Sequence, residues 1–266
     1  MGHRYKGVQR YSLPFKVLGI GILDSLSNLI TSLFSAGEQG AFYIPRPVVN
    51  GVQSLFQDAA GTTPVTADGD PVGLVLDKSG NGNHASQGIS AARPVYRTDG
   101  TLHWLLANGV DEFLLSDFIT LTGARCGASI AALWDNEMLN VRADGTGFAD
   151  FTFRLTGNDF NIYQSAPQRT DQLSTITART SGGVSVVTAI ASESDAKTWQ
   201  NGVEQGSRTT GAFLDFDSQN QPQRITLFTG EFSSCSFYGA VVSLGYVESQ
   251  KDQVEAYLAN LAGVTL

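Results

Sequence analysis

The 266-residue sequence predicts an all-β fold, a sandwich or jelly roll, on three observations. Short runs rich in β-branched and aromatic residues follow one another through most of the chain. Turn-forming pairs separate many of them, and charged residues make up only 16% of a chain that contains 29 glycines. Short strands at such spacing are typical of sandwiches and not of βαβ units. The turn pairs are Asp99-Gly100, Asn108-Gly109, Asp144-Gly145, Gly157-Asn158 and Asn201-Gly202.

Ten segments of the chain are predicted to be strands. One of them, Phe148–Leu155, alternates apolar and polar residues, which indicates a sheet with one buried face. The ten are Gly73–Leu76, Leu102–Leu106, Glu112–Leu115, Ser129–Leu133, Phe148–Leu155, Phe160–Tyr163, Gly183–Ile190, Lys197–Trp199, Arg224–Phe228 and Gly239–Leu244.

A segment of a different kind, Val17–Ala36, lies near the start of the chain. Its apolar residues recur at helical spacing, so we expect an amphipathic helix that docks on another protein. A signal peptide or membrane anchor is the alternative, but Asp24 interrupts the apolar run and leaves it too short to span a membrane. Residues 1–40 are thus interpreted as a docking arm and residues 41–266 as the β domain. The expected docking residues are Leu23, Leu26, Ile30, Leu33 and Phe34.

The chain ends with a predicted helix. One face of it carries Val254, Tyr257, Leu258 and Leu261. Ser249 with Asp252 three residues later indicates the start of this helix, and Gly263 indicates its end.

The charge is distributed unevenly, and this argues against nucleic acid as a partner. Residues 1–36 contain four of the 17 basic residues and one of the 25 acidic residues, so the rest of the chain has a net charge of −11. Phosphate contacts need Lys and Arg, and this part of the chain has fewer basic than acidic residues.

The loop after the first predicted strand carries oxygen-bearing side chains at every second position: Asp77, Ser79, Asn81 and Asn83. A calcium loop begins in this way, but its twelfth position should be acidic and is Gly88 here. Asn and Gly also suit a tight turn. We therefore predict a structural turn and no cofactor, with a calcium site as the weaker alternative. Cys126 and Cys235 are expected to be two buried thiols or one disulfide.

Catalytic signatures are weak in this sequence. Paired carboxylates spaced as in glycan-cleaving enzymes are missing, and no Gly-x-Ser-x-Gly motif occurs. The nearest acidic pairs, Glu193/Asp195 and Asp215/Asp217, lie in turn-like sequence. We therefore predict a protein that is not an enzyme.

Aromatic residues suggest a binding surface instead. Trp104 and Trp199 lie in strand-like runs and are expected in the core. Residues that flank loops, either at a strand end or beside the Gln/Ser/Pro-rich segment 164–172, are the candidate ligand contacts. These candidates are Trp134, Asn136, Tyr163 and Arg169.

Several fragments together resemble the laminin-G-like, concanavalin-A-like jelly roll: residues 77–85, 93–114, 198–206 and 237–259. In that family the 77–85 loop is mainly a structural connector. Asp111-Glu112 stands where the family usually has two aspartates, which weakens any metal role. Residues 54–87 are similar to a segment common in structural proteins of tailed bacteriophages. The resemblance extends over about residues 40–266.

This resemblance implies a non-enzymatic virion protein on the tail, collar or capsid surface. It implies an adhesive or decorating module with weak binding to host-surface glycan, present in many copies or as a homo-oligomer. Other virion proteins would bind the N-terminal arm, and no membrane span is expected. The alternatives are a secreted lectin-like carbohydrate-binding module and a glycan hydrolase.

Overall fold

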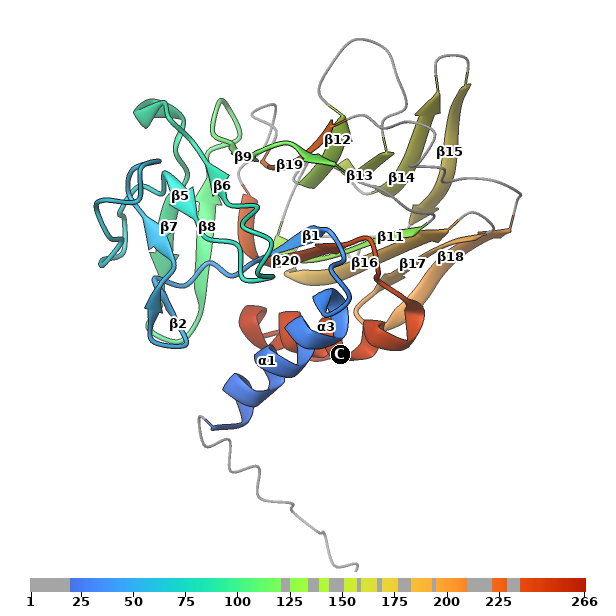
Figure 1. Ribbon diagram of the computed structural model, residues 1–266, viewed down its shortest axis with the longest axis horizontal. Coiled ribbons are helices and arrows are strands. Elements are labelled where there is room, and N and C mark those ends of the chain that lie inside the picture. The colour runs from blue at the N-terminus through green and yellow to red at the C-terminus, as the bar shows by residue number, and fades with distance from the viewer. Residues whose placement is uncertain are drawn as a thin grey trace, which may run out of the picture.

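The computed structural model describes residues 20–120, 125–133, 139–143, 151–156, 159–166, 169–176, 183–192, 195–209, 222–228 and 235–266. Two sheets pack face to face, and two helices cover the outer face of the larger one (Figure 1). No helix in these ranges is long and apolar enough to cross a membrane.

The larger sheet has eight antiparallel strands, and its central strands come from distant parts of the chain. β1 pairs with β20 beside the main order of strands. In spatial order the other seven are β18 (Val203–Thr209), β17 (Asp195–Gln200), β16 (Ser185–Ser192), β11 (Arg125–Leu133), β20 (Cys235–Ser243), β8 (His103–Ala107) and β7 (Val95–Thr98), and β1 is Gly40–Tyr43.

The smaller sheet has seven mostly short strands. Its members are β10 (Ile119–Thr120), β19 (Pro222–Leu227), β9 (Leu114–Ser116), β6 (Ala85–Ser86), β5 (Leu74–Val75), β4 (Leu55–Phe56) and β12 (Leu139–Ala143), the last pairing with β19. Three further strands form a separate sheet, and two form a small hairpin. These are β13 (Phe151–Thr156), β14 (Asp159–Ala166) and β15 (Arg169–Ile176), then β2 (Val48–Val49) and β3 (Val52–Gln53); a short 3-10 helix spans Ser90–Ala92.

Strand alternation builds the core between the two sheets. Along β11, Cys126, Ala128 and Ile130 point to the smaller sheet, whereas Ser129 and Ala131 point to the helices. All ten predicted strand segments overlap strands of the structure. The turn at Asn201-Gly202 joins β17 to β18, and both residues have positive φ (48° and 82°), as a tight hairpin turn requires.

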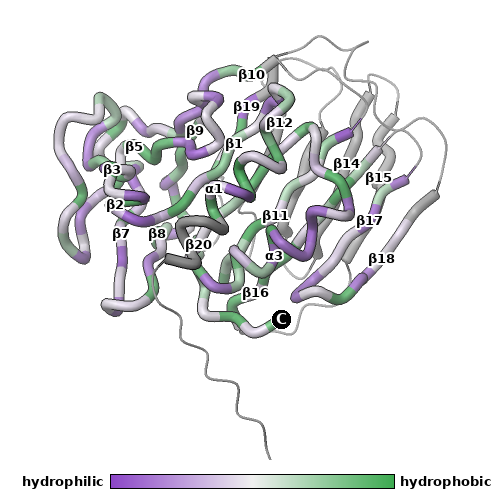
Figure 2. The backbone as a smooth tube through the Cα atoms, turned by 60° about the horizontal axis from the view of Figure 1, so that its bottom comes forward, coloured by the Kyte–Doolittle hydropathy of each residue, from purple (hydrophilic) through white to green (hydrophobic). Residues whose placement is uncertain are grey.

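The two helices, α1 (Ile20–Phe34) and α3 (Glu248–Ala262), pack on the outer face of the larger sheet and on each other. Figure 2 views this face and shows the helices across β11, β16 and β20. The predicted helical face of α3 is confirmed, because Val254, Tyr257, Leu258 and Leu261 are all buried. Gly263 ends α3 with φ 67°.

The start of α3 differs from the predicted one. The N-cap is Val247, whose backbone N–H donates to Gln250 Oε1 at 2.9 Å. The predicted capping pair, Ser249 and Asp252, lies two residues too late, because Glu248 is already helical. A Gln three residues after the cap does the work that a Ser–Asp pair would do.

The helix predicted near the N-terminus is present as α1, but its apolar residues pack within this chain. Leu26, Leu33 and Phe34 are buried in the same cluster as residues of α3 and the larger sheet, and Ile30 packs against that cluster. Leu23 lies in α1, and its side chain is outside the described ones. The predicted partner contact of Leu26, Leu33 and Phe34 is therefore corrected: this chain's own sheet and α3 bury them.

Replacing Leu33 by alanine is expected to lower the free energy of unfolding by about 3 kcal/mol, because it leaves a cavity under a fully buried side chain. Val203→Ala is the matched control, since that aliphatic side chain is 63% exposed. Urea unfolding of both variants measures the difference. If Leu33→Ala is no less stable than Val203→Ala, α1 does not form part of the folded core.

Candidate functional site

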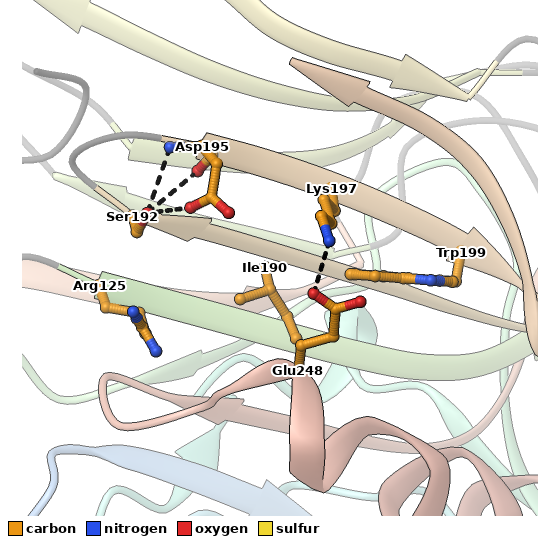
Figure 3. Close-up of a pocket in the computed structure, with 7 residues that line it drawn as sticks. All are labelled: Arg125, Ile190, Ser192, Asp195, Lys197, Trp199 and Glu248. Atoms are coloured by element: carbon orange, nitrogen blue, oxygen red, sulfur yellow. Dashed lines mark hydrogen bonds and ion pairs between the residues drawn. The ribbon is translucent and has the colours of Figure 1, made fainter. Parts of the chain in front are cut away.

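A small pocket lies on the outer face of the larger sheet, where α3 begins (Figure 3). Ile190 and Ser192 alternate on β16, and Asp195, Lys197 and Trp199 alternate on β17, so all five point to one face. The pairing Ile190↔Lys197 places the two sets beside each other. Two further residues complete the lining: Arg125, which pairs with Ser192 across β11 and β16, and Glu248 of α3.

Two of the charged groups in the pocket neutralise each other. Lys197 Nζ lies 2.7 Å from Glu248 Oε2, and this hydrogen bond raises the pKa of Lys197. Asp195 is engaged by Ser192: the hydroxyl donates to Asp195 Oδ1 and accepts from the Asp195 backbone N–H at 3.2 Å. Both carboxylates of the pocket are therefore hydrogen-bonded within the protein.

The floor of the pocket is apolar and closely packed. Ile190 is 8% exposed and Trp199 only 3%. Lys251 Nζ lies 5.5 Å from the centroid of the Trp199 ring, so one face of the indole is covered by α3. The pocket volume is about 130 Å³. Drug-sized ligands occupy about 300–1,000 Å³, so this pocket has room for a single ring.

Arg125 and Glu248 are the exposed residues of the lining, and Glu248 is paired with Lys197. Within the described part of the chain the guanidinium of Arg125 makes no hydrogen bond or ion pair. In Figure 3 it points away from Asp195. The pocket thus combines an apolar floor, two satisfied carboxylates and one cation that is available to a ligand.

Of the four predicted ligand residues, the structure describes the backbone of two. Trp134 and Asn136 lie outside the described residues. Tyr163 lies within β14, and Arg169 begins β15, so the segment predicted as a loop is largely a strand pair with Ala166 opposite Arg169.

The tryptophans expected in the core follow that expectation to different degrees. Trp199 is buried. Trp104 is half-buried and packs against the cluster under the helices, where its ring centroid lies 5.9 Å from that of Tyr238.

Sequence reasoning missed the pocket because its signal is spread over three segments. Asp195 was assigned to a turn, whereas it begins β17, and Glu193 and the pair Asp215/Asp217 lie outside the described residues. The usable signal was the alternation of Ile190, Ser192, Asp195, Lys197 and Trp199 across one hairpin. Arg125 and Glu248 could not be added without knowing which strands are neighbours.

The loop at Asp77 is held by internal hydrogen bonds. Asp77 Oδ1 accepts hydrogen bonds from the backbone N–H groups of Phe42 and Ser79, both at 2.8 Å. Asp77 Oδ2 accepts from Ser79 Oγ at 2.6 Å and from the Asn83 N–H at 3.1 Å. Four internal bonds therefore occupy a carboxylate that is 8% exposed.

The two asparagines of this loop tie down the segment before β1. The side-chain amide of Asn83 donates to Gly40 O at 2.6 Å, and that of Asn81 donates to Glu38 O at 3.0 Å and Gly40 O at 3.1 Å. In the parts of the chain described here, no group of three or more His, Cys, Asp and Glu side chains could hold a metal ion.

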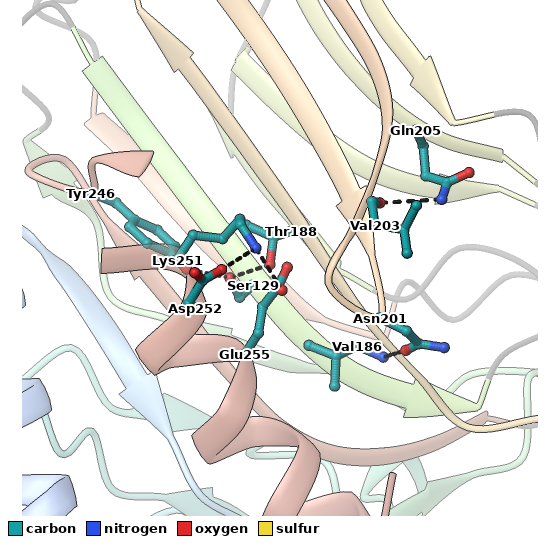
Figure 4. A network of polar contacts seen from close by, with 10 residues as sticks. All are labelled: Ser129, Val186, Thr188, Asn201, Val203, Gln205, Tyr246, Lys251, Asp252 and Glu255. Atoms are coloured by element: carbon teal, nitrogen blue, oxygen red, sulfur yellow. Dashed lines mark hydrogen bonds and ion pairs between the residues drawn. The ribbon is translucent and has the colours of Figure 1, made fainter. Parts of the chain in front are cut away.

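A second polar cluster is buried beneath α3 (Figure 4). Lys251 Nζ lies 3.0 Å from Glu255 Oε2 and 2.6 Å from Asp252 Oδ1. Ser129 Oγ hydrogen-bonds both Thr188 Oγ1 and Tyr246 Oη at 2.8 Å. Burial raises the pKa of Tyr246 far above its ordinary value. The hydroxyl bonds hold Tyr246, just before α3, to the larger sheet, and the ion pairs stay within α3.

Cys126 and Cys235 are both buried thiols in the core between the sheets. Burial raises the pKa of Cys126 well above its ordinary value, so its reactive thiolate form is disfavoured.

Comparison with known proteins identifies the fold. No protein-family model matches the sequence, and no curated protein matches it. Among solved structures, a botulinum neurotoxin serotype D binding domain has a TM-score of 0.55 at 8% identity, over 88% of this chain and 52% of that one. An arabinofuranosidase complexed with arabinofuranosyl-α-1,2-xylobiose has a TM-score of 0.53 at 13% identity, over 88% and 65%.

The binding domain of botulinum neurotoxin DC in complex with rat synaptotagmin II also matches, with a TM-score of 0.52 at 8% identity, over 85% and 52%. The chain spans about half the length of these neurotoxin binding domains. Identities this low show the fold alone. The chain has the jelly-roll sandwich that the sequence predicted, with a helix near its N-terminus and a helix at its C-terminus.

Proposed function

We propose that the protein is a non-enzymatic structural protein of a bacteriophage particle, whose jelly roll binds host-surface glycan weakly. The observation that carries the binding role is the pocket beside α3, with an apolar floor at Ile190 and Trp199 and a charged rim. Sugar sites have this character, because ring C–H groups pack on apolar surface and hydroxyls bond to polar groups. The particle context is supported by the resemblance of residues 54–87 to phage structural proteins.

The shared fold is compatible with binding and with catalysis, since a neurotoxin binding domain and an arabinofuranosidase both match. The state of the pocket carboxylates favours binding. Glycoside hydrolysis needs one protonated carboxylic acid and a second, ionised carboxylate. Here Glu248 Oε2 is bound by Lys197 Nζ, and Asp195 Oδ1 accepts the Ser192 hydroxyl. Both carboxylates are thus engaged by groups of this chain.

Attachment to the particle is assigned to the N-terminal segment. The buried face of α1 is used within the chain, so a virion partner would contact its exposed side, where Ser27, Asn28 and Thr31 lie. One small pocket binds weakly, near millimolar or about −4 kcal/mol. Many copies on one particle would raise the effective affinity by orders of magnitude. Display on the tail, collar or capsid surface supplies that multivalency.

The test is binding of the full chain to an array of bacterial surface polysaccharides, as monomer and as a streptavidin-linked tetramer. We expect the tetramer to be retained on a subset of polysaccharides and the monomer to bind at least tenfold more weakly. Lys197→Trp fills the pocket and should abolish retention, whereas Val203→Trp, at an exposed position of β18, should leave it intact. Retention of neither form, or equal retention of both variants, would contradict the proposal.

A further inference from the structure

We propose that Arg125 selects sugar residues that carry a carboxylate, and that it is the specificity determinant of the pocket beside α3. This inference rests on the glycan-binding function proposed above. It starts from the charges of the pocket, which are Arg125, Lys197, Asp195 and Glu248.

Three of these charged groups already bind other groups of the chain. Lys197 and Glu248 form an ion pair of 2.7 Å, and Asp195 accepts the hydroxyl of Ser192. Arg125 makes no ion pair or hydrogen bond with any residue that the structure describes. A guanidinium offers five N–H donors in a planar fork that matches a carboxylate. A carboxylate is therefore the ligand group that would bind most favourably to Arg125.

The arrangement of the lining gives the ligand an orientation. Arg125 pairs with Ser192 in the sheet, and Figure 3 shows Ile190 between Arg125 on one side and Trp199 on the other. A sugar ring over Ile190 would direct a carboxylate to Arg125 and hydroxyls to the Lys197–Glu248 pair. The carboxylate would lie on the side of the pocket away from Asp195, because the guanidinium points away from that residue.

The burial of the pocket floor explains why Arg125 would decide between acidic and neutral sugars. Ile190 and Trp199 form the floor on which a sugar ring would pack, but they expose only 8% and 3% of their surface, so this packing supplies only part of the affinity. Stacking on an open aromatic face, the usual source of affinity for neutral sugars, is limited here because Lys251 covers one face of the indole. A charge-assisted, bidentate bond to Arg125 supplies what the floor does not.

The experiment compares sugars that differ only in this group. Methyl β-D-glucuronide and methyl β-D-glucoside, and the matching galacturonide and galactoside, are titrated against the full chain by ligand-observed NMR. We expect at least one uronide to bind about five- to tenfold more tightly than its neutral partner. The preference should shrink in 1 M salt, because exposed ion pairs are screened.

Two variants assign that preference to the pocket. Arg125→Gln should abolish it, and Arg97→Gln should not, since Arg97 is an exposed arginine of β7 that pairs with Asp68. Equal binding of acidic and neutral glycosides, unchanged in Arg125→Gln, overturns this inference and leaves the glycan-binding function standing. Binding of none of the four glycosides overturns this inference, and the glycan-binding function also fails if the polysaccharide array gives no retention.

Discussion

Replacing Lys251 by methionine is expected to lower the free energy of unfolding by about 3–5 kcal/mol at pH 7. The substitution removes the cation that faces Glu255, a carboxylate with no exposed surface. One oxygen of that carboxylate, Oε1, already has no hydrogen-bond partner. The variant would bury a charge with no counter-ion, which is the most costly way to break a buried pair.

The effect should depend on pH in a defined direction. Burial alone would lower the pKa of Lys251, but the bonds to Asp252 and Glu255 outweigh it and raise the pKa above 10.5. A lysine whose pKa is raised by folding stabilises the fold fully below its unfolded value. That stabilisation is lost as the pH rises through the folded value. The difference between wild type and Lys251→Met should therefore be constant from pH 7 to 9 and diminish above pH 10.5.

The control is the double variant Lys251→Met/Glu255→Leu, which replaces the pair with apolar groups of similar volume. It should recover most of the lost stability, because hydrophobic replacement of a buried ion pair is often neutral or favourable. Denaturant unfolding at several pH values measures all three proteins. A single variant as stable as wild type, or a double variant no better than the single one, would contradict this account of the pair.

The sequence predicted the strands well because local chemistry determines them. The turn at Asn201-Gly202 needs two residues with positive φ, and the sequence has Asn and Gly there. The face of α3 was equally readable, since Val254 and Leu258 recur at helical spacing and are both fully buried. The sequence does not show which surface packs against the apolar face of a helix. The apolar face of α1 fits an external partner and the chain's own sheet equally, and only the fold shows that Leu33 packs on α3 and the larger sheet.

The candidate site was beyond prediction for a related reason. Its residues come from β11, β16, β17 and α3, and no local pattern says that these elements are neighbours. The burial of one charged pair also differs from what its sequence spacing indicates. Lys251 and Glu255 look like an exposed helical pair at a spacing of four residues, yet both are buried residues of α3.

Replacing Asp77 by alanine is expected to destabilise the protein by about 3–5 kcal/mol, since each buried group left without its partner costs about 1–3 kcal/mol. Three backbone N–H groups, those of Phe42, Ser79 and Asn83, would lose their acceptor. The N–H of Phe42 belongs to β1, so the loss would also loosen the strand that joins the helix α1 to the sheet.

A second aspartate of the chain, Asp58, has a similar set of hydrogen bonds in a less buried place. It accepts two backbone N–H bonds and one hydroxyl bond, from Thr62 and Thr63, and it is partly exposed. Water can replace its carboxylate, so Asp58→Ala should cost much less than Asp77→Ala. Thermal unfolding of both variants, with calcium and with EDTA, also tests the calcium alternative. If the loop is a connector, calcium leaves the wild-type Tm unchanged; a rise in Tm that Asp77→Ala abolishes would mean that the carboxylate binds the ion.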